Sequence, residues 1–363
     1  MGNVPSRKLN LYTPAAMVGH FDEISAAGAI DPQALSEIAE RYGMEVVGPV
    51  PEGYTYTNAA VTRMPRKIAV IGVPSSAGAY AIGQEAAPAA LRAAGLVARL
   101  RAAGADVDDT GDSPIWAWRP DRVRPRAQNL EAVIDQVRAT RQRVARATRD
   151  GRIAFVLGGD CTVGLGTVSG VLDVNESVGM IYFDLHADMN TPASVNDGAL
   201  DWMGVAHMLA LDGTEPDLTR VGRRVPLLGA EQIALFAHGM ESATPWEKEQ
   251  IERMSLARIS VEDVRQDAAA AARDAVAGMR SRFSQYLVHL DVDVIDFTDA
   301  PLSENTGRNT GLSFGAAAQA LHALLADEGL VALTVAEVNP AHAIAEEGLL
   351  ERFAATLADA IQP

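Results

Sequence analysis

From residue 67 onward, short continuous apolar runs alternate along the chain with longer alanine-rich stretches of helical pattern. Runs such as Lys67-Ile-Ala-Val-Ile-Gly-Val73 lack the in-and-out alternation of a half-exposed strand, so they predict strands that are buried on both faces. Strands that alternate with helices are typical of a parallel sheet with helices on both sides. The sequence therefore predicts the α/β class, as a three-layer α-β-α fold with a central parallel sheet.

These patterns also place the individual elements. Strands are expected at residues 67–73, 153–157, 180–183, 225–228, 286–290 and 330–335. Helices are expected at residues 87–100, 130–150, 245–255, 261–283 and 314–328. Residues 1–64 follow neither pattern, apart from a helix expected over 32–42 with Asp31 as its N-cap. We therefore expect an N-terminal extension, 1–64, and a main domain, 65–363.

The composition narrows the range of partners and surroundings. A net charge of −16 argues against nucleic acid, whose phosphates need clustered Lys and Arg, and is compatible with a cationic small molecule. Cys161 is the only cysteine, so no intrachain disulfide can form. The chain shows no secretory signal pattern and no apolar run of membrane-spanning length, so a cytoplasmic protein without a membrane partner is expected.

Polar side chains follow four of the expected strands at their carboxyl ends. These sets are Gly158-Gly-Asp-Cys161, Asp184-Leu-His-Ala-Asp188, Asp291-Val-Asp293 and Glu337-Val-Asn-Pro340. Open parallel sheets build their ligand sites at the carboxyl ends of the strands. The four loops are therefore expected to meet over one crevice.

Six side chains in these loops are of types that bind metals: Cys161, Asp184, His186, Asp188, Asp291 and Asp293. Carboxylates can bridge, so this set suffices for two divalent ions with a water between them. Asp291 and Asp293 would otherwise be acids inside an apolar run, where an unpaired charge is costly. The residues therefore predict a metal site, and two ions on one water would supply hydroxide near neutral pH.

The same motifs resemble those of the ureohydrolases, the family of the arginases, agmatinases and guanidinobutyrases. Gly158-Gly-Asp-Cys161 is similar to the family's G-G-D-H, and residues 184–192 are similar to D-A-H-x-D-x-x-T/R-P. Residues 291–296 with Ala300-Pro301 are similar to S-F-D-x-D-x-x-D-P, and Glu337-Val-Asn-Pro340 is the last matching motif. The likeness covers roughly residues 65–360. It implies an arginase-like fold, a homo-oligomer (trimer or hexamer), and hydrolysis of a small cationic guanidino compound to urea and an amine.

The resemblance also implies roles for individual residues. One of two manganese-type ions would be held by Cys161, Asp184, Asp188 and Asp291, and the other by His186, Asp184, Asp291 and Asp293, with Asp184 and Asp291 bridging. Glu337 would bind the guanidinium of the substrate, because a carboxylate matches that planar fork of donors. Asn190 and Arg308 would be further substrate contacts, and Arg308 would favour a substrate with a carboxylate. Asp188, Glu337 and Asp201 are the expected catalytic acids.

Two positions depart from the family's pattern. Cys161 stands where the family has His, and a soft thiolate makes zinc, iron, cobalt or nickel credible beside manganese. The loop after Asn190 lacks the proton-shuttling His of arginases, and Asp201 is the nearest titratable residue. His207 and His289 are expected to be buried, hydrogen-bonded residues rather than replacements. The sequence therefore defines the reaction type better than the substrate. Arginine, agmatine, guanidinobutyrate and other guanidino compounds are all candidates.

Two other functions are left open at this stage. Cys161 could be a nucleophile with His186 as its base, in a thiol-dependent amidinohydrolase or amidinotransferase, although the four aspartates would then have no role. The chain could also be a non-catalytic or regulatory relative that keeps the fold. Chelation, thiol alkylation and a turnover assay separate the three functions.

Overall fold

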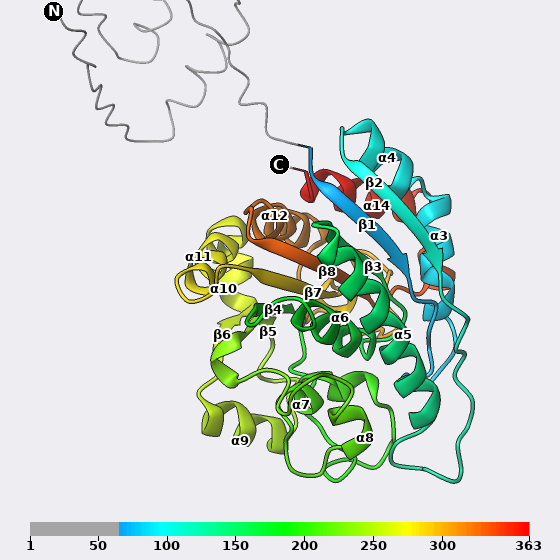
Figure 1. Cartoon of the computed structure of the whole chain (residues 1–363), viewed down its shortest axis with the longest axis vertical. Coiled ribbons are helices and arrows are strands. Elements are labelled where there is room, and N and C mark those ends of the chain that lie inside the picture. The colour runs from blue at the N-terminus through cyan, green and yellow to red at the C-terminus, as the bar shows by residue number, and fades with distance from the viewer. Residues whose placement is uncertain (1–64, 363) are drawn as a thin grey trace, which may run out of the picture. The chain divides into compact units, whose positions relative to one another are not determined.

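Eight parallel strands form one sheet in the order β2-β1-β3-β8-β7-β4-β5-β6 (Figure 1). The structure, a computed structural model, describes residues 65–362, so the expected extension 1–64 and its helix 32–42 lie outside the described residues. The strands are β1 (Lys67–Gly72), β2 (Asp106–Asp112), β3 (Ile153–Leu157), β4 (Gly179–Phe183), β5 (Ile233–His238), β6 (Ala257–Ser260), β7 (Tyr286–Asp291) and β8 (Leu330–Ala336). The predicted parallel sheet is therefore confirmed.

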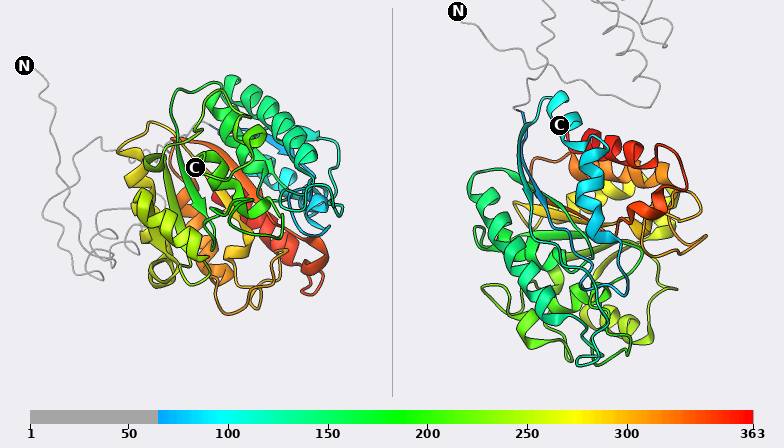
Figure 2. Two further views of the ribbon diagram at one scale, coloured as in Figure 1. Left: turned by 90° about the horizontal axis from the view of Figure 1, so that it is seen from below. Right: turned by 90° about the vertical axis from the view of Figure 1, so that its right-hand side faces the viewer.

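Helices cover both faces of this sheet. One layer contains α3 (Ala87–Ala93), α4 (Leu96–Ala102), α10 (Val261–Gln266), α11 (Ala268–Arg280), α12 (Phe314–Leu325) and α14 (Leu349–Ala360). The other contains α5 (Leu130–Arg149), α6 (Val163–Leu172), α7 (Gly204–Met208), α8 (Pro216–Thr219) and α9 (Pro245–Met254). Figure 2 shows the sheet between the two layers from two further directions. The three-layer α-β-α prediction is thus confirmed.

Strand β1 shows why these sequences form central strands. Ile68 and Val70 pack into the first layer, whereas Ala69 and Ile71 pack into the second, because successive side chains of a strand point to opposite faces. Both faces are covered, so all of these side chains are buried. A continuous apolar run is the pattern that such a position requires.

The expected strand at 225–228 is wrong. Val225 is 53% exposed and Pro226 has no N–H for a sheet, so the segment is a loop, and the strand is β5 a few residues later. The edge strands β2 and β6 were not expected either. Strand β2 (Asp-Val-Asp-Asp-Thr-Gly-Asp) is acidic and has no apolar run, as suits an edge that must not pair with another chain.

Two expected helices are each divided in the structure. The segment 87–100 is broken at Gly95, whose φ of 88° is left-handed, and 261–283 is broken at Asp267, which caps α11 through its side chain. Helix α6 was not expected, because its sequence has no polar face. It is buried on all sides between α5 and the sheet, so no amphipathic pattern is required. In the described chain, no helix is long and apolar enough to cross a bilayer.

The fold brings the four polar loops together. Strands β3, β8, β7 and β4 are consecutive neighbours in the sheet, and each predicted loop follows one of them. Asp188 (φ 50°) and Glu337 (φ 64°) both have left-handed backbones at this edge, a conformation that costs free energy for residues other than glycine. The four loops therefore meet at one edge of the sheet, as expected for a ligand site.

Candidate metal centre

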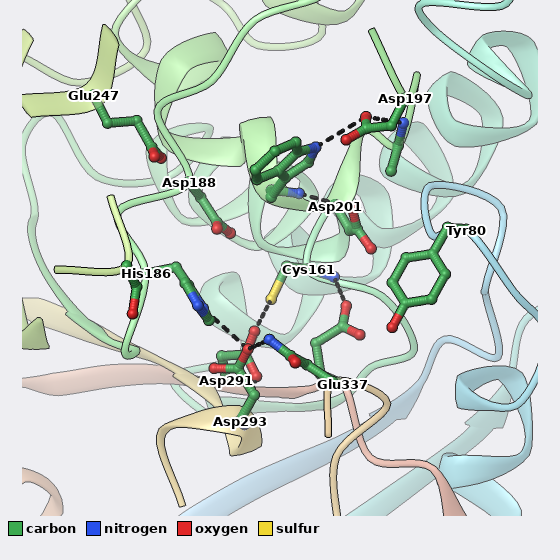
Figure 3. A pocket seen from close by; sticks show the side chains of 14 residues that line it. Tyr80, Cys161, His186, Asp188, Asp197, Asp201, Glu247, Asp291, Asp293 and Glu337 are labelled. Carbon is green, nitrogen blue, oxygen red and sulfur yellow. Dashed lines mark hydrogen bonds and ion pairs between the residues drawn. The ribbon is translucent and has the colours of Figure 1, made fainter. Parts of the chain in front are cut away.

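A cavity of about 370 Å³ opens over the carboxyl ends of strands β3, β8, β7 and β4 (Figure 3). Seven acids line it: Asp188, Asp197, Asp201, Glu247, Asp291, Asp293 and Glu337. Cys161, His186, Tyr80, Trp202 and Asn305 also line the cavity. Among the described lining residues there is no Lys or Arg, so the cavity is suited to cations.

Two groups of side chains in this region have metal-ligand geometry. The ligand atoms of Cys161, Asp184 and Asp291 all lie within 4.8 Å of one another, and so do those of Asp184, His186 and Asp293. Asp184 belongs to both groups, which is the arrangement expected of a bridging carboxylate. Asp291 belongs to the first group only, and Asp188 lines the same cavity outside both groups. The Tyr182 hydroxyl donates to Asp188 Oδ2.

The turn after β3 holds Cys161 at the edge of the cavity. Gly159 lies so close to the loop after β1 that a Cβ there would be 1.6 Å from the Ser75 carbonyl oxygen. The buried Asp160 carboxylate accepts from Ser75 Oγ at 3.0 Å and from the Gly78 N–H at 3.1 Å. Glycine and aspartate are therefore needed in this turn for packing and hydrogen bonding, and they fix the backbone of Cys161.

The Cys161 sulfur has two polar neighbours. Its thiol donates to Asp291 Oδ2 at 3.1 Å, and His289 Nε2 lies 3.1 Å from the sulfur. Burial, followed by the charge of Asp291, raises the pKa of the thiol well above its ordinary value. Because His289 is the histidine that contacts the sulfur, a nucleophilic role for Cys161 would need His289 rather than His186 as its base.

His186 and Asp293 form an ion pair in which Nδ1 lies 3.0 Å from Asp293 Oδ2. Burial lowers the pKa of His186, but the charges and hydrogen bonds of Asp293 and Asp184 outweigh it and raise this pKa well above the ordinary value. Burial raises the pKa of Asp293, but His186, together with a hydrogen bond from Asn305, lowers it overall. The acids around His186 therefore stabilise its protonated, positively charged form.

The remaining acids of the cluster have raised pKa values. Burial raises the pKa of Asp184 and Asp291, with the charge of Asp293 next, and it raises that of Asp188, with the charge of Asp184 next. Asp184 Oδ2 and Asp293 Oδ1 are buried and have no hydrogen-bond partner. Bound cations would contact these unpaired oxygens and offset the repulsion between the carboxylates. The residues therefore fit divalent ions.

Glu337 lies on the opposite wall of the cavity from His186 and also contacts Cys161. Its Oε1 accepts from the Cys161 N–H at 2.8 Å, and its Oε2 accepts from Gln84 Nε2 at 3.1 Å. Burial, followed by the charges of Asp201 and Asp160, raises its pKa well above the ordinary value. A cationic ligand beside Glu337 would relieve that repulsion.

The other predicted site residues lie at different distances from the cavity. Asp201 lines it, and burial together with the charge of Asp160 raises the pKa of Asp201. Asn190 is buried outside the lining, where its Oδ1 accepts from Thr244 Oγ1 at 2.9 Å. The structure does not bring Arg308 to the lining, because its exposed guanidinium lies over the Phe297 ring, 4.9 Å from the centroid.

His207 and His289, which were expected to be buried, are both buried. His207 Nδ1 lies 2.7 Å from the Met203 carbonyl oxygen, its Nε2 accepts from the Glu215 N–H, and burial lowers its pKa to about 4. His289 is 1% exposed, and burial lowers its pKa to about 3. Both imidazoles are therefore neutral at neutral pH.

Sequence reasoning assigned no role to Tyr80, Trp202 or Asn305 of the cavity lining, or to Gln84, which lies outside the lining and donates to Glu337. Gln84 precedes Glu337 by 253 residues, so no local pattern could join them. Asn305 lies in the Gly- and Thr-rich segment 305–311, and its Nδ2 donates to Asp293 Oδ2 at 3.1 Å. For Asn305 the position of that segment, shortly after the Asp291 motif, was the available signal.

The parallel three-layer fold and the acidic cavity at one edge of its sheet define an α/β protein with a candidate metal site. Comparisons with known proteins identify the family. Residues 66–361 match the description of the arginase family. The arginase of Bacillus caldovelox is 29% identical over 280 residues, 76% of this chain and 91% of that protein, and the arginase of Brevibacillus brevis is 29% identical over 303 residues, 82% and 98%. The solved structure of the Bacillus caldovelox arginase superposes with a TM-score of 0.73 at 27% identity, covering 82% of this chain and 98% of that chain. The chain belongs to the arginase family, and the resemblance to ureohydrolases is confirmed.

Proposed function

We propose that this protein is a metal-dependent amidinohydrolase that cleaves a small guanidino compound to urea and an amine. The observation that carries the proposal is the pair of ligand groups that share Asp184 on one wall of an acidic cavity, with Glu337 on another wall. The arginase-family relatives support the hydrolytic reaction type.

The ligand set suits two divalent ions. Cys161, Asp184 and Asp291 would hold one ion, with Asp188 completing its shell, and Asp184, His186 and Asp293 would hold the other. Such ions would lower the pKa of a shared water enough to supply hydroxide near neutral pH. Carboxylate and imidazole donors suit manganese, whereas the Cys161 thiolate favours zinc, iron, cobalt or nickel at the first position.

The chain's own residues would orient the substrate and move the proton. Glu337 would accept the guanidinium N–H groups and present the guanidino carbon to the metal-bearing wall. Addition of hydroxide gives a tetrahedral carbon, and its collapse must move one proton from the oxygen to the leaving nitrogen. Asp188, which lines the cavity beside the first ligand group, is the carboxylate that we assign to this transfer, and Asp201 would exchange the proton with solvent.

The side of the cavity away from His186 suits a substrate whose far end is cationic or neutral (Figure 3). Asp197 and Asp201 line it together with the aromatic side chains of Tyr80 and Trp202. An ammonium group is stabilised by carboxylates and by aromatic faces, whereas a carboxylate would be repelled by the acids and would find no Lys or Arg among the described lining residues. We therefore propose an amine-ended guanidino compound, of the agmatine type, rather than an amino acid or a guanidino acid.

The test is urea release by the full-length protein across a panel of agmatine, L-arginine and 4-guanidinobutyrate, with manganese, zinc, iron, cobalt and nickel supplied in turn. We expect turnover that depends on metal and is lost to a chelator, with the highest kcat/KM for agmatine. A higher kcat/KM for L-arginine or for 4-guanidinobutyrate would overturn the amine-ended substrate class while leaving the reaction in place. Absence of urea from every combination, with metal bound, would overturn the catalytic proposal and support a non-catalytic role.

A further inference from the structure

The imidazole of His289 contacts the sulfur of Cys161. His289 belongs to β7, two residues before Asp291, so both side chains lie on the same face of the strand. Its Nε2 is 3.1 Å from Cys161 Sγ. Neither of the two ligand groups includes His289, so it contacts a proposed ligand without belonging to the set.

The imidazole is held in a closely fitting socket. It stacks on the Tyr182 ring, with centroids 4.6 Å apart and planes 9° from parallel. Gly164 of α6 lies against its other nitrogen, and a Cβ at that position would be 2.7 Å from Nδ1. The ring is therefore fixed in orientation, with Nε2 directed at the sulfur.

The hydrogen-bond partners determine which nitrogen carries the proton. Nδ1 is buried and has no hydrogen-bond partner, whereas Nε2 faces a sulfur that can accept. A neutral imidazole has one N–H, and an unpaired buried N–H is costly, so the proton belongs on Nε2. With its proton there, His289 donates to Cys161 Sγ, while the thiol's own proton is directed at Asp291 Oδ2.

This tautomer excludes two other roles for His289 in the arrangement described. A nitrogen that carries a proton cannot bind a metal ion, and it cannot accept the proton of the thiol. The lone pair of Nδ1 is directed toward Gly164 of α6, away from the cysteine. His289 is thus arranged neither as a metal ligand nor as the base of a nucleophilic cysteine.

We propose that His289 is a positioning residue that donates an N–H···S hydrogen bond to the Cys161 thiolate when that thiolate holds a metal ion. The inference rests on the proposed function, because it takes Cys161 to be a ligand. A donor behind the sulfur offsets part of the thiolate's charge and fixes the direction of its lone pairs, as outer hydrogen bonds do for metal ligands in general. Through its contact with Tyr182, whose hydroxyl donates to Asp188, the same socket links two proposed ligands of one ion.

Three substitutions of His289 separate the hydrogen bond from the packing. In His289→Gln the side-chain amide N–H can reach the sulfur from the position of Nε2. In His289→Asn the amide ends near the position of Nδ1 and cannot. His289→Phe keeps an aromatic ring on Tyr182 without a donor, and circular dichroism establishes which variants are folded. Cys161→Ser is the control for any signal from the thiolate.

The readout is the sulfur-to-metal charge-transfer absorption of the full-length protein loaded with Co²⁺, together with a Co²⁺ titration. A hydrogen bond lowers the energy of the sulfur lone pairs, so its loss should move the band to longer wavelength in His289→Asn and His289→Phe. We also expect Co²⁺ affinity at this site to fall by about 10- to 100-fold in both, as for other outer-shell partners. His289→Gln should stay close to the parent protein in both measurements.

The outcomes distinguish the inference from the proposed function. A parent protein that binds Co²⁺ without a thiolate band overturns ligation by Cys161 and the role of His289, whereas the proposed hydrolysis is decided separately by the urea assay. A band that is present in the parent and unmoved in folded His289→Asn and His289→Phe overturns only the role of His289. Iodoacetamide alkylation of Cys161 in metal-free protein provides a separate check. If the alkylation rate falls when His289 is replaced, His289 acts as a base toward the thiol, and the assigned tautomer is overturned.

Discussion

At the scale of single residues, Glu337 has a strained backbone and a buried, hydrogen-bonded carboxylate. Its left-handed backbone is supported by bonds from its N–H to the Gly159 carbonyl and from the Glu304 N–H to its own carbonyl. Its carboxylate is buried and takes hydrogen bonds from Cys161 and Gln84. A glutamate held this rigidly beside a metal-type cluster is expected to orient a ligand rather than only to stabilise a loop.

Replacing Glu337 with Gln tests that role. The amide keeps the shape, and its Oε1 can still accept from the Cys161 N–H. Gln84, whose Oε1 has no partner, can turn its own amide to accept from the new N–H, so we expect a folded protein. Loss of the charged contact should lower kcat/KM by about a hundredfold or more, since such contacts are worth roughly 2 to 5 kcal/mol.

Metal content is the control for the Glu337→Gln variant, because Glu337 is outside both ligand groups. It should equal that of the parent protein, measured by elemental analysis after dialysis. A folded, fully metallated variant with nearly normal kcat/KM would exclude Glu337 as the guanidinium-binding residue. A purely structural role would instead appear as a lower unfolding midpoint with unchanged rate.

At the scale of elements, the close contact of α5 with α6 supports the turn that carries Cys161, because α6 begins directly after that turn. Helix α6 approaches α5 through glycines. A Cβ on Gly170 would be 2.6 Å from the Arg141 carbonyl oxygen and 2.7 Å from Val144 Cβ. Since both neighbours are main-chain or branched atoms in a packed helix, they cannot move aside cheaply.

Gly170→Ala should therefore destabilise the protein. We expect the free energy of unfolding to fall by about 1–3 kcal/mol, as for overpacking elsewhere, measured from the urea midpoint at constant slope. The matched control is Gly278→Ala in α11, where a new Cβ would have no atom within 4 Å. That change should raise the free energy of unfolding by about 0.5–1 kcal/mol through helix propensity. Equal shifts in the two variants would show that propensity alone governs Gly170.

At the scale of the whole molecule, the buried acids couple stability to pH and to metal. Asp184 has its pKa raised from 3.8 to about 7, mainly by burial. A carboxyl whose folded pKa is raised contributes stability that is fully present below its unfolded pKa and is lost as pH rises through the folded value. The metal-free protein therefore loses this contribution between about pH 4 and pH 7. Bound cations compensate the deprotonated carboxylates, and they bind more tightly as protons leave.

The difference in melting temperature between metal-loaded and metal-free protein should therefore be larger near pH 8 than near pH 6. Ions at about 100 times their Kd stabilise the folded state by about 2.7 kcal/mol, which differential scanning calorimetry resolves. Asp184→Ala should abolish most of this difference, because Asp184 belongs to both ligand groups. A difference that shrinks as pH rises, or that survives in Asp184→Ala, would contradict the shared-ligand arrangement. Homo-oligomeric assembly remains a prediction from the resemblance, and a cytoplasmic location remains a prediction from the sequence.

Local pattern in the sequence determined the class of fold and most of the proposed ligands. Continuous apolar runs such as Lys67–Gly72 identify strands covered on both faces, because burial acts on each residue in turn. Polar residues at the ends of such runs identify the edge where ligands bind. Asp184, His186, Asp291 and Asp293 could be found in this way, because parallel strands end at a common edge.

Only the tertiary structure decided the remaining features, since they depend on neighbours that are distant in the chain. The edge strands β2 and β6 pair on one side only, and therefore carry no apolar run that the sequence would reveal. Arg308 was expected at the site from its position in the chain, but its guanidinium lies over Phe297 instead. His289 meets Cys161 across 128 residues, and Gln84 meets Glu337 across 253. Periodicity reports which face of an element is buried, whereas hydrogen-bond partners are set by how the loops pack in space.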